Sequence, residues 1–306
     1  MQFFAFGETL LDLITDKQLN MVARPGGSQF NIAANLAVSG FNVQLISIIG
    51  DDDPGQIIAS TAQKAGIGVD FLQRNKMFKT ALAFAIIDDS GMPSYTFYKD
   101  YPEPLFMPMS LPSMTSESCF SFGSMAALEK QWQPTLSKLM QLAQEAGALI
   151  FYDPNIRTQV NTKDEELLLL RNMRAAHIVR GSDEDFFALF GTADPKIIFE
   201  KAALQEDRLL FVTQGPEEVL CYQHKKLSRF AVPLQKPLST VGAGDAFNSG
   251  LLAFLAKSGM SAKQIGKLTE EDLGMMTAMA VSFSADVCRS KGNTISDELA
   301  QRIAAF

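Results

Sequence analysis

The chain is poor in the residue types that build disulfides and most metal centres. It has three cysteines and two histidines among 306 residues. Cys119, Cys221 and Cys288 lie far apart and form no CxxC pair, which argues against a disulfide framework and a Cys/His zinc site. We therefore expect the cysteines to be buried structural thiols.

Positive charge is also scarce. Lysine and arginine total 27 against 34 aspartates and glutamates, so the formal net charge is −7. Neutralising a nucleic-acid backbone takes a basic face, and no Lys/Arg-rich stripe is present, so we expect no nucleic-acid partner. The composition still allows binding of small anionic ligands, because backbone N–H groups can hold a phosphate without net positive charge.

Long apolar runs are lacking as well. No run approaches the roughly 18 residues needed to span a bilayer. The first segment carries Glu8 and Asp12, where a signal peptide would carry Lys or Arg. We expect a cytoplasmic protein with no membrane partner. With 47% apolar and 20% charged residues, the composition supplies a large core and excludes disorder and coiled coil.

Short apolar runs alternate with longer helical patterns along most of the chain. We predict helices over residues 29–39 and 132–146, one that follows the turn at 51–55 and runs to about Ala65, and several after Gly242. The predicted strands cover residues 3–6, 43–49, 119–122, 148–152, 176–180 and 208–213. Strands alternating with helices imply βαβ units and a mostly parallel sheet covered on both faces.

One region breaks this rhythm. Residues 80–87 and 94–98 are β-rich runs joined by Asp-Asp-Ser-Gly, a hairpin signal, with no helix between them. We predict a small antiparallel flap, completed by residues near 13–24 and extending over about 79–104. It could be a lid, a dimer surface or both, or a surface hairpin without a role. No linker or repeat divides the chain, so we expect one domain, residues 1–306, with the flap inserted.

The strongest local motif opens the helical pattern after residue 241. Gly242, Ala243 and Gly244 place a glycine-lined loop at a helix N-terminus, where unpaired N–H groups and the helix dipole favour an anion. Asp245 follows in the first turn. A carboxylate there suits a general base that takes a hydroxyl proton while the loop holds developing charge. Alternatively, Asp245 simply stabilises the helix and the glycines form a tight turn.

Two other phosphate-binding motifs do not fit. A Rossmann fingerprint needs a third glycine where Phe247 stands. A Walker A loop needs Gly-Lys-Ser/Thr, whereas Gly266 and Lys267 are followed by Leu268.

Weaker motifs surround other predicted strand ends. Asp12, Gly26, Gly27 and Asn31 could offer donors and acceptors to a polyol, although Gly-Gly before a helix is also an ordinary cap. Arg157, in the loop after the strand at 148–152, could pair with a phosphate or a carboxylate, or lie in solvent. The segment 213–215 follows another strand end.

Together these motifs, in this order over almost the whole chain, resemble the ribokinase-like carbohydrate kinases of the phosphofructokinase-B type. Two widely separated signatures carry the resemblance, the loop 26–31 and the loop 240–245. It is supported by Gly7, Glu8 and Asp12 and by the segments 50–55, 153–157 and 213–215. The resemblance implies an α/β fold of three α/β/α layers, doubly wound around a mostly parallel sheet, with a small antiparallel β lid.

The resemblance also implies a role for each motif in transferring the ATP γ-phosphate to a sugar hydroxyl. Asp245 is the base, and Gly242, Ala243 and Gly244 form the anion hole. The implied sugar-facing residues are Asp12, Gly26, Gly27, Asn31, Lys99 and Arg157. The implied nucleotide-side residues are Ser182, Asp185, Thr213 and Gly215. Mg²⁺ is held mainly by the phosphates, with Asp185 able to reach it through water.

The sequence departs from the family pattern at several positions. Ser239 stands where the family has an aspartate linked to a monovalent cation, which puts potassium activation in doubt. Ser182 and Asp185 replace the usual Asn-x-x-Glu, and Lys99 keeps the charge of an arginine found in many fructokinases but loses its fork. The base and anion hole remain.

The resulting hypothesis is an ATP-dependent sugar kinase acting on a primary hydroxyl, of the fructokinase type. Within the family, a 2-keto-3-deoxygluconate kinase is the alternative, because Arg157 and Lys99 could meet a sugar-acid carboxylate. A nucleoside kinase is a third. A different class is a degenerate sugar or nucleotide sensor, suggested by Ser239 and Asp185. The resemblance also allows a homodimer through the β lid.

Overall fold

The computed structural model describes residues 1–15, 20–87, 93–103, 105, 110–156, 160 and 162–305. Its strands are β1 (Gln2–Phe6), β2 (Leu10–Thr15), β3 (Met21–Gly26), β4 (Val43–Gly50), β5 (Leu72–Asn75), β6 (Leu82–Ile87), β7 (Pro93–Tyr98), β8 (Ser118–Gly123), β9 (Leu149–Asp153), β10 (Ile178–Ser182), β11 (Leu209–Thr213), β12 (Glu218–Gln223) and β13 (Lys226–Ala231). Its α-helices are α1 (Ser28–Val38), α2 (Asp53–Lys64), α3 (Gln133–Ala146), α4 (Lys163–Ala175), α5 (Asp183–Phe190), α6 (Pro195–Lys201), α7 (Ala243–Lys257), α8 (Glu270–Cys288) and α9 (Asp297–Ala305). Short 3₁₀ turns include η1 (Met125–Ala127).

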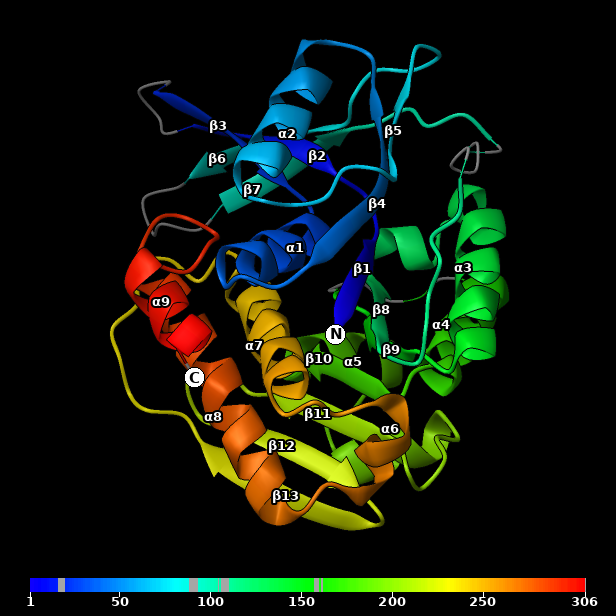
Figure 1. Cartoon of the computed structure of the whole chain (residues 1–306), viewed down its shortest axis with the longest axis vertical. Helices are drawn as coiled ribbons and strands as arrows, with labels where there is room; N and C mark the ends of the chain where they lie inside the picture. The colour runs from blue at the N-terminus through cyan, green and yellow to red at the C-terminus, as the bar shows by residue number, and fades with distance from the viewer. Residues whose placement is uncertain are drawn as a thin grey trace.

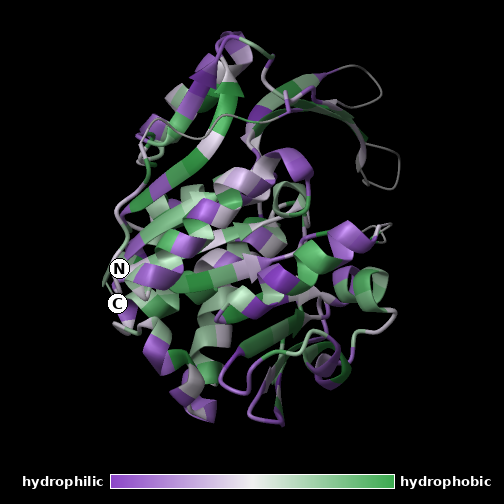
Figure 2. Ribbon diagram, turned by 90° about the vertical axis from the view of Figure 1, so that its right-hand side faces the viewer, coloured by the Kyte–Doolittle hydropathy of each residue, from purple (hydrophilic) through white to green (hydrophobic). Residues whose placement is uncertain are grey.

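The large sheet separates two apolar cores because alternate side chains of each strand point to opposite faces. In β1, Phe3 and Ala5 enter the core shared with α1, α7 and α8. Phe4 and Phe6 enter the core shared with α3, α4 and α6. Helices therefore cover both faces (Figure 1), and apolar residues concentrate on the strands between them (Figure 2). The predicted three-layer α/β/α architecture is confirmed.

The sheet has the order β13-β12-β11-β10-β9-β8-β1-β4-β5. From β11 through β5 the neighbouring strands are parallel, as predicted. Two antiparallel strands, β12 and β13, extend one edge beyond β11, and they were not predicted from the sequence. The predicted strand over 176–180 begins two residues later, because α4 ends at Ala175 and Ala176 is its C-cap.

The predicted second sheet is present, in the order β3-β2-β6-β7 (upper left of Figure 1). Its outer pairs, β2–β3 and β6–β7, are antiparallel as predicted. The central pair, β2–β6, is parallel, which corrects the expectation of a wholly antiparallel flap. The reason is topological, since the chain between β2 and β6 passes through β3, α1, β4, α2 and β5 and returns in the same direction. The predicted Asp-Asp-Ser-Gly turn lies outside the described residues.

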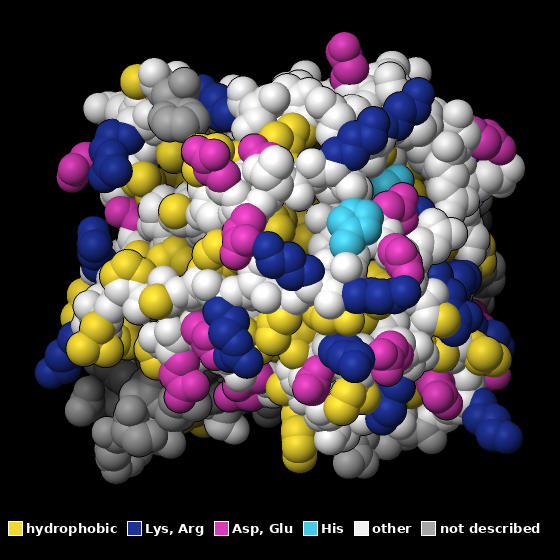
Figure 3. Space-filling view, turned by 90° about the horizontal axis from the view of Figure 1, so that it is seen from below, with side chains coloured by type: hydrophobic (Ala, Val, Ile, Leu, Met, Phe, Trp, Pro, Cys, Tyr) yellow, Lys and Arg dark blue, Asp and Glu magenta, His cyan; other side chains and the backbone are white. Residues whose placement is uncertain are grey.

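The cysteines, the surface charges and the lengths of the apolar helices can be compared with the expectations from composition. Cys119, Cys221 and Cys288 are buried and form no disulfide in the described part of the chain. Lysines and arginines are interspersed with aspartates and glutamates on the face opposite the small sheet (Figure 3). Among the helices of the described residues, none is long and apolar enough to cross a membrane.

Candidate active site

The N-terminus of α7 lies at the edge of the large sheet where its parallel strands end. Gly242 is the N-cap, with φ +79°, a left-handed conformation that glycine adopts without steric cost. No described side chain caps this helix. The Ala243 N–H donates to the Thr240 carbonyl oxygen at 3.2 Å, whereas the N–H groups of Gly242 and Gly244 have no hydrogen-bond partner among the described residues. These two N–H groups are available to an anion, and the helix dipole adds to the attraction. The anion hole expected from Gly242, Ala243 and Gly244 has this geometry.

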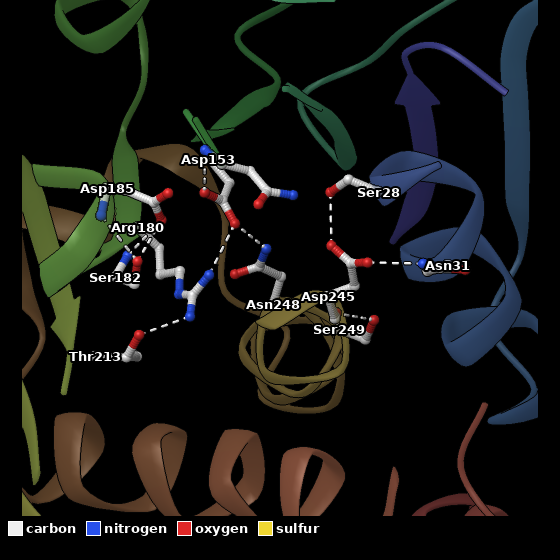
Figure 4. A network of polar contacts seen from close by, with 11 residues as sticks. Ser28, Asn31, Asp153, Arg180, Ser182, Asp185, Thr213, Asp245, Asn248 and Ser249 are labelled. Atoms are coloured by element: carbon white, nitrogen blue, oxygen red, sulfur yellow. Dashed lines mark hydrogen bonds and ion pairs between the residues drawn. The ribbon is translucent and has the colours of Figure 1, made fainter. Parts of the chain in front are cut away.

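Asp245 projects from the first turn of α7 toward the N-terminus of α1 (Figure 4). Its Oδ1 accepts a hydrogen bond from Ser28 Oγ at 2.7 Å, and its Oδ2 accepts one from Asn31 Nδ2 at 2.8 Å. The side chain is 8% exposed, and this burial raises its pKa to about 6, against the opposing effect of the two hydrogen bonds. A fixed carboxylate with a pKa just below neutral suits a general base.

A second carboxylate lies close by on the small sheet. Asp12 in β2 pairs across strands with Arg24 in β3, and its side chain occupies the space that a side chain at Gly26 would need. Burial raises the pKa of Asp12 to about 6, with Arg24 opposing and Asp245 adding to the rise. The two aspartates are thus near enough to interact electrostatically.

Gly27 brings these elements together. It is the N-cap of α1, with φ +109°. A Cβ there would lie 2.3 Å from the carbonyl oxygen of Glu8, so only glycine lets the start of α1 approach the end of β1 this closely. The sequence motif 26–31 therefore places Asn31 and Ser28 against Asp245, and Gly26 beneath Asp12.

A buried ion pair lies on the other side of α7. Arg180 Nη1 donates to Asp153 Oδ2 at 3.0 Å, and Nη2 donates to Thr213 Oγ1 at 2.6 Å. Asn248 Nδ2 donates to the same Asp153 oxygen at 2.5 Å. Burial raises the pKa of Asp153, while Arg180 lowers it. The network ties the ends of β9, β10 and β11 to α7 (Figure 4).

The other expected nucleotide-side residues follow strands of the same edge. Ser182 caps α5, and its Oγ and backbone N–H both donate to Asp185 Oδ2. The second oxygen, Asp185 Oδ1, is buried with no hydrogen-bond partner among the described residues. Gly215 lies in the exposed turn between β11 and β12, with φ +54°.

Asp185 is the carboxylate best suited to help bind Mg²⁺. Its free oxygen is a hard donor of the kind that Mg²⁺ prefers. Within the described residues there is no group of three or more His, Cys, Asp or Glu side chains that could hold a metal alone. This donor set fits an ion bound mainly through phosphates.

Lys99 lies in an acidic cluster. Its Nζ is 2.6 Å from Glu129 and 3.4 Å from Glu8, so two carboxylates already compensate its charge. Burial alone would lower the pKa of Lys99, but Glu8 and Glu129 raise it. The cluster joins the segment after β7 to the ends of β1 and η1. Arg157, the other cation expected to face the sugar, lies outside the described residues.

Four residues of the site were not proposed from the sequence, although the sequence positions of two of them, Arg180 and Asn248, indicate a role. The four are Ser28, Asp153, Arg180 and Asn248. Arg180 is a charged residue at the end of an apolar strand, a position where burial requires a partner. Asn248 follows Asp245 by three residues, about one helical turn. Their partners come from distant segments, which no local pattern specifies.

This arrangement, a carboxylate beside an uncapped helix N-terminus in a three-layer sheet, agrees with the comparison to known families. Residues 2–298 match the pfkB family carbohydrate kinases. The chain belongs to this family. It is 28% identical over 295 residues to a fructokinase of Salmonella typhimurium, covering 90% of this chain and 95% of that protein.

Solved structures share the fold. A fructokinase from Xylella fastidiosa with bound ATP superposes with a TM-score of 0.84 at 23% identity, covering 99% of this chain and 98% of the other. An aminoimidazole riboside kinase from Salmonella enterica, complexed with aminoimidazole riboside and an ATP analog, has a TM-score of 0.84 at 21% identity and covers 99% and 100%. The carbohydrate kinase fold therefore extends over the whole chain.

Proposed function

We propose that this pfkB kinase is an ATP-dependent fructokinase that phosphorylates a primary hydroxyl of a ketohexose. The observation that carries the proposal is Asp245, held by Ser28 and Asn31 within reach of the uncapped N-terminus of α7. A hydroxyl placed there can lose its proton to Asp245 while it attacks a phosphate bound at the helix. The similarity to a named fructokinase supports fructose as the acceptor.

In this mechanism the sugar lies between the small sheet and α1. Asp12 and the backbone at Gly26 and Gly27 bind its hydroxyls, and Asp245 accepts the proton of the reacting one. The backbone of residues 242–244, where the N–H groups of Gly242 and Gly244 have no described partner, holds the charge that develops on the transferred phosphoryl group. One preorganised donor of this kind contributes about 3 kcal/mol to a barrier, and a general base about 10²–10⁴ in rate.

The nucleotide occupies the side of α7 that faces β10 and β11. Thr213 and Gly215 flank it, and Asp185, oriented by Ser182, would help to hold Mg²⁺. The ion would neutralise part of the negative charge of the phosphates. We expect little stimulation when potassium replaces choline, because Ser239 Oγ accepts the Val241 N–H and provides no carboxylate for a cation. The proposed setting for this reaction is the cytoplasm.

The charges around the sugar pocket favour a neutral sugar over a sugar acid. Asp12, Asp245, Glu8 and Glu129 are carboxylates. Lys99 is paired with the last two, and Arg24 lies opposite Asp12. A sugar-acid carboxylate would therefore meet mainly negative charge, which costs affinity. A 2-keto-3-deoxygluconate kinase is thus less consistent with the described residues.

The test is ADP release with ATP and Mg²⁺ over a panel of fructose, tagatose, ribose, 2-keto-3-deoxygluconate and adenosine. We expect fructose to give the highest kcat/KM. A riboside as the preferred acceptor would support the alternative raised by the second structural neighbour. Ligand-induced thermal stabilisation without turnover for any acceptor would indicate the sensor instead.

We also propose that the small sheet is a lid and a dimer surface of the single kinase domain. Its β2 and β3 pack on α2, whereas Val22, Tyr95 and Phe97 point to the other face, which also carries Asp12. Val22 and Phe97 are largely exposed, and the rings of Tyr95 and Phe97 stack at 6.0 Å. A second copy related by a twofold axis would bury this apolar face with its own.

A further inference from the structure

Arg180 is a buried cation that presses against the first turn of α7. Its side chain is 8% exposed although it carries a full charge. A Cβ built on Gly244 would lie 3.0 Å from Nη1 and 3.4 Å from Nη2. The guanidinium therefore occupies the space where a side chain at Gly244, a residue of the expected anion hole, would lie.

Three strands and one helix fix the direction of this guanidinium. Arg180 extends from β10, Asp153 in β9 and Thr213 in β11 each bind one of its terminal nitrogens, and the ring of Phe247 lies 5.4 Å away. Its Nε is buried without a hydrogen-bond partner among the residues that the structure describes. The guanidinium carries five N–H donors, so the contacts with Asp153 and Thr213 do not use all of them.

Asp153 accepts hydrogen bonds from other groups besides Arg180. Its Oδ2 also accepts from Asn248, and its Oδ1 accepts from the backbone N–H of Asn155. The carboxylate of Asp153 is thus held by three donors, two of them neutral, which fixes its position relative to Arg180 and α7.

Arg180 and Asp245 lie on opposite sides of the α7 axis in the view down the helix (Figure 4). Asp245 faces α1, where the sugar hydroxyl is expected, and Arg180 faces the strand ends where the nucleotide is expected. A phosphoryl group passing from nucleotide to sugar would cross the helix N-terminus between them. Each of the two side chains then lies at one end of that path.

We propose that Arg180 is a further catalytic residue, whose guanidinium binds the nucleotide's terminal phosphates and stabilises the charge of the phosphoryl group in transfer. The inference rests on the proposed kinase activity. Arginine suits this role because its planar fork binds phosphate oxygens and stays charged when buried. The backbone N–H groups of α7 and the guanidinium would then share the transferred charge.

The central experiment compares the parent with the double variant Arg180→Met/Asp153→Asn. The second substitution avoids an unpaired buried carboxylate, and the asparagine can still accept from the Asn155 N–H. We expect kcat to fall at least about 100-fold, the range seen when a preorganised donor is lost, while the KM for the sugar changes less than threefold. Arg171→Met, which removes a half-buried arginine bound to Gln133 and Asn172, is the matched control and should keep its kcat.

A folded double variant with kcat within threefold of the parent would overturn the proposal. If the double variant does not fold, the kcat of the single variant Arg180→Lys tests the proposal instead. A single ammonium cannot hold Asp153 and also reach the phosphates, so kcat should fall at least about tenfold. A value within threefold of the parent contradicts the role.

Calorimetry separates this inference from the proposed function. Arg180 should strengthen the binding of ATP but not that of adenosine, because adenosine lacks the phosphates. The ratio of the two dissociation constants should shrink at least tenfold in Arg180→Lys, whether or not any sugar is phosphorylated. If the parent has no turnover but this ratio shrinks, only the proposed activity fails. An unchanged ratio overturns the role of Arg180.

Discussion

At the residue scale, burial and hydrogen bonding act in opposite directions on the carboxylate of Asp245. Burial raises its pKa to about 6, while Asn31, Ser28 and Arg180 favour the ionised form. The balance leaves a group that is ionised at neutral pH and still basic enough to take a proton. The neighbours that orient the carboxylate are thus also those that keep it charged.

Replacing this carboxylate should remove turnover and leave nucleotide binding intact. We expect Asp245→Asn to lower kcat by at least about 10², the lower bound for a general base. ATP affinity, measured by calorimetry, should change little, because the anion hole is built from backbone. A near-parental kcat would show that another group takes the proton.

The raised pKa also predicts a pH profile. The base works only when deprotonated, so kcat/KM should fall as pH drops through about 6. Asp12, with a pKa also raised to about 6, should steepen this acidic limb. The measurement is kcat/KM from pH 4.5 to 8.5. An acidic limb centred near pH 4 would mean that neither carboxylate titrates in the free enzyme as the geometry implies.

The same shift predicts that Asp245 destabilises the fold at neutral pH. Its pKa rises from 3.8 to about 6 on folding, so the folded state binds the proton more tightly. The resulting stability is present below about pH 4 and is lost as pH rises through 6. Asp245→Asn should therefore raise the free energy of unfolding by about 1–3 kcal/mol at pH 7.5 and change it little at pH 4. If Asp245→Asn changed the free energy of unfolding by the same amount at pH 4 and at pH 7.5, the prediction would be contradicted.

At the element scale, the start of α7 depends on the backbone conformation of Gly242. Its φ of +79° disfavours any other residue, and an added Cβ would lie 3.2 Å from the Cβ of Asn293. Asn293 is itself fixed, because its carbonyl accepts from Asn35 in α1. The loop after α8 therefore joins the start of α7, the proposed anion hole, to α1.

Gly242→Ala should lower both stability and kcat. We expect a loss of about 1–2 kcal/mol from the left-handed conformation, with a tenfold or larger fall in kcat because the N–H groups move. Gly259→Ala is the matched control, since Gly259 has φ +64° and no atom within 4 Å of an added Cβ. It should be destabilised similarly but keep its kcat. Equal kcat in both variants would remove the anion hole from the mechanism.

At the scale of the whole molecule, the small sheet has one face on α2 and one apolar face outward. Phe97 is 57% exposed on that outer face. Burying such a face against a second copy would also bring the two lids into contact, so that closure over the sugar and assembly would be linked. Sugar affinity would then depend on protein concentration.

Sedimentation should detect this assembly. We expect a dimer at micromolar concentration for the parent and a monomer for Phe97→Lys, because a buried ammonium without a partner disfavours association. Leu167→Lys is the control, since Leu167 is 65% exposed on α4, a helix that packs on β9 and η1. A monomeric parent, or a dimeric Phe97→Lys variant, would contradict the proposed interface.

Local patterns along the sequence were enough to determine the main architecture. The alternation of apolar strands and amphipathic helices predicted the parallel core, and the hairpin signal predicted a second sheet. Glycines before two helices predicted where backbone N–H groups would be exposed. Such features depend on neighbouring residues, since periodicity, turn chemistry and capping act within a few positions.

Contacts between distant segments were decided only in the tertiary structure. The partners of Asp245 lie 217 and 214 residues away, and those of Arg180 come from two other strands. The parallel β2–β6 pair and the pairing of Lys99 with Glu8 and Glu129 also depend on the path of the chain. The sequence by itself determined most of the strands and helices, and it is the source of the proposal that Asp245 is the base and that residues 242–244 form the anion hole. Which charges surround them was decided by packing, because burial and electrostatic coupling depend on distances in space rather than along the chain.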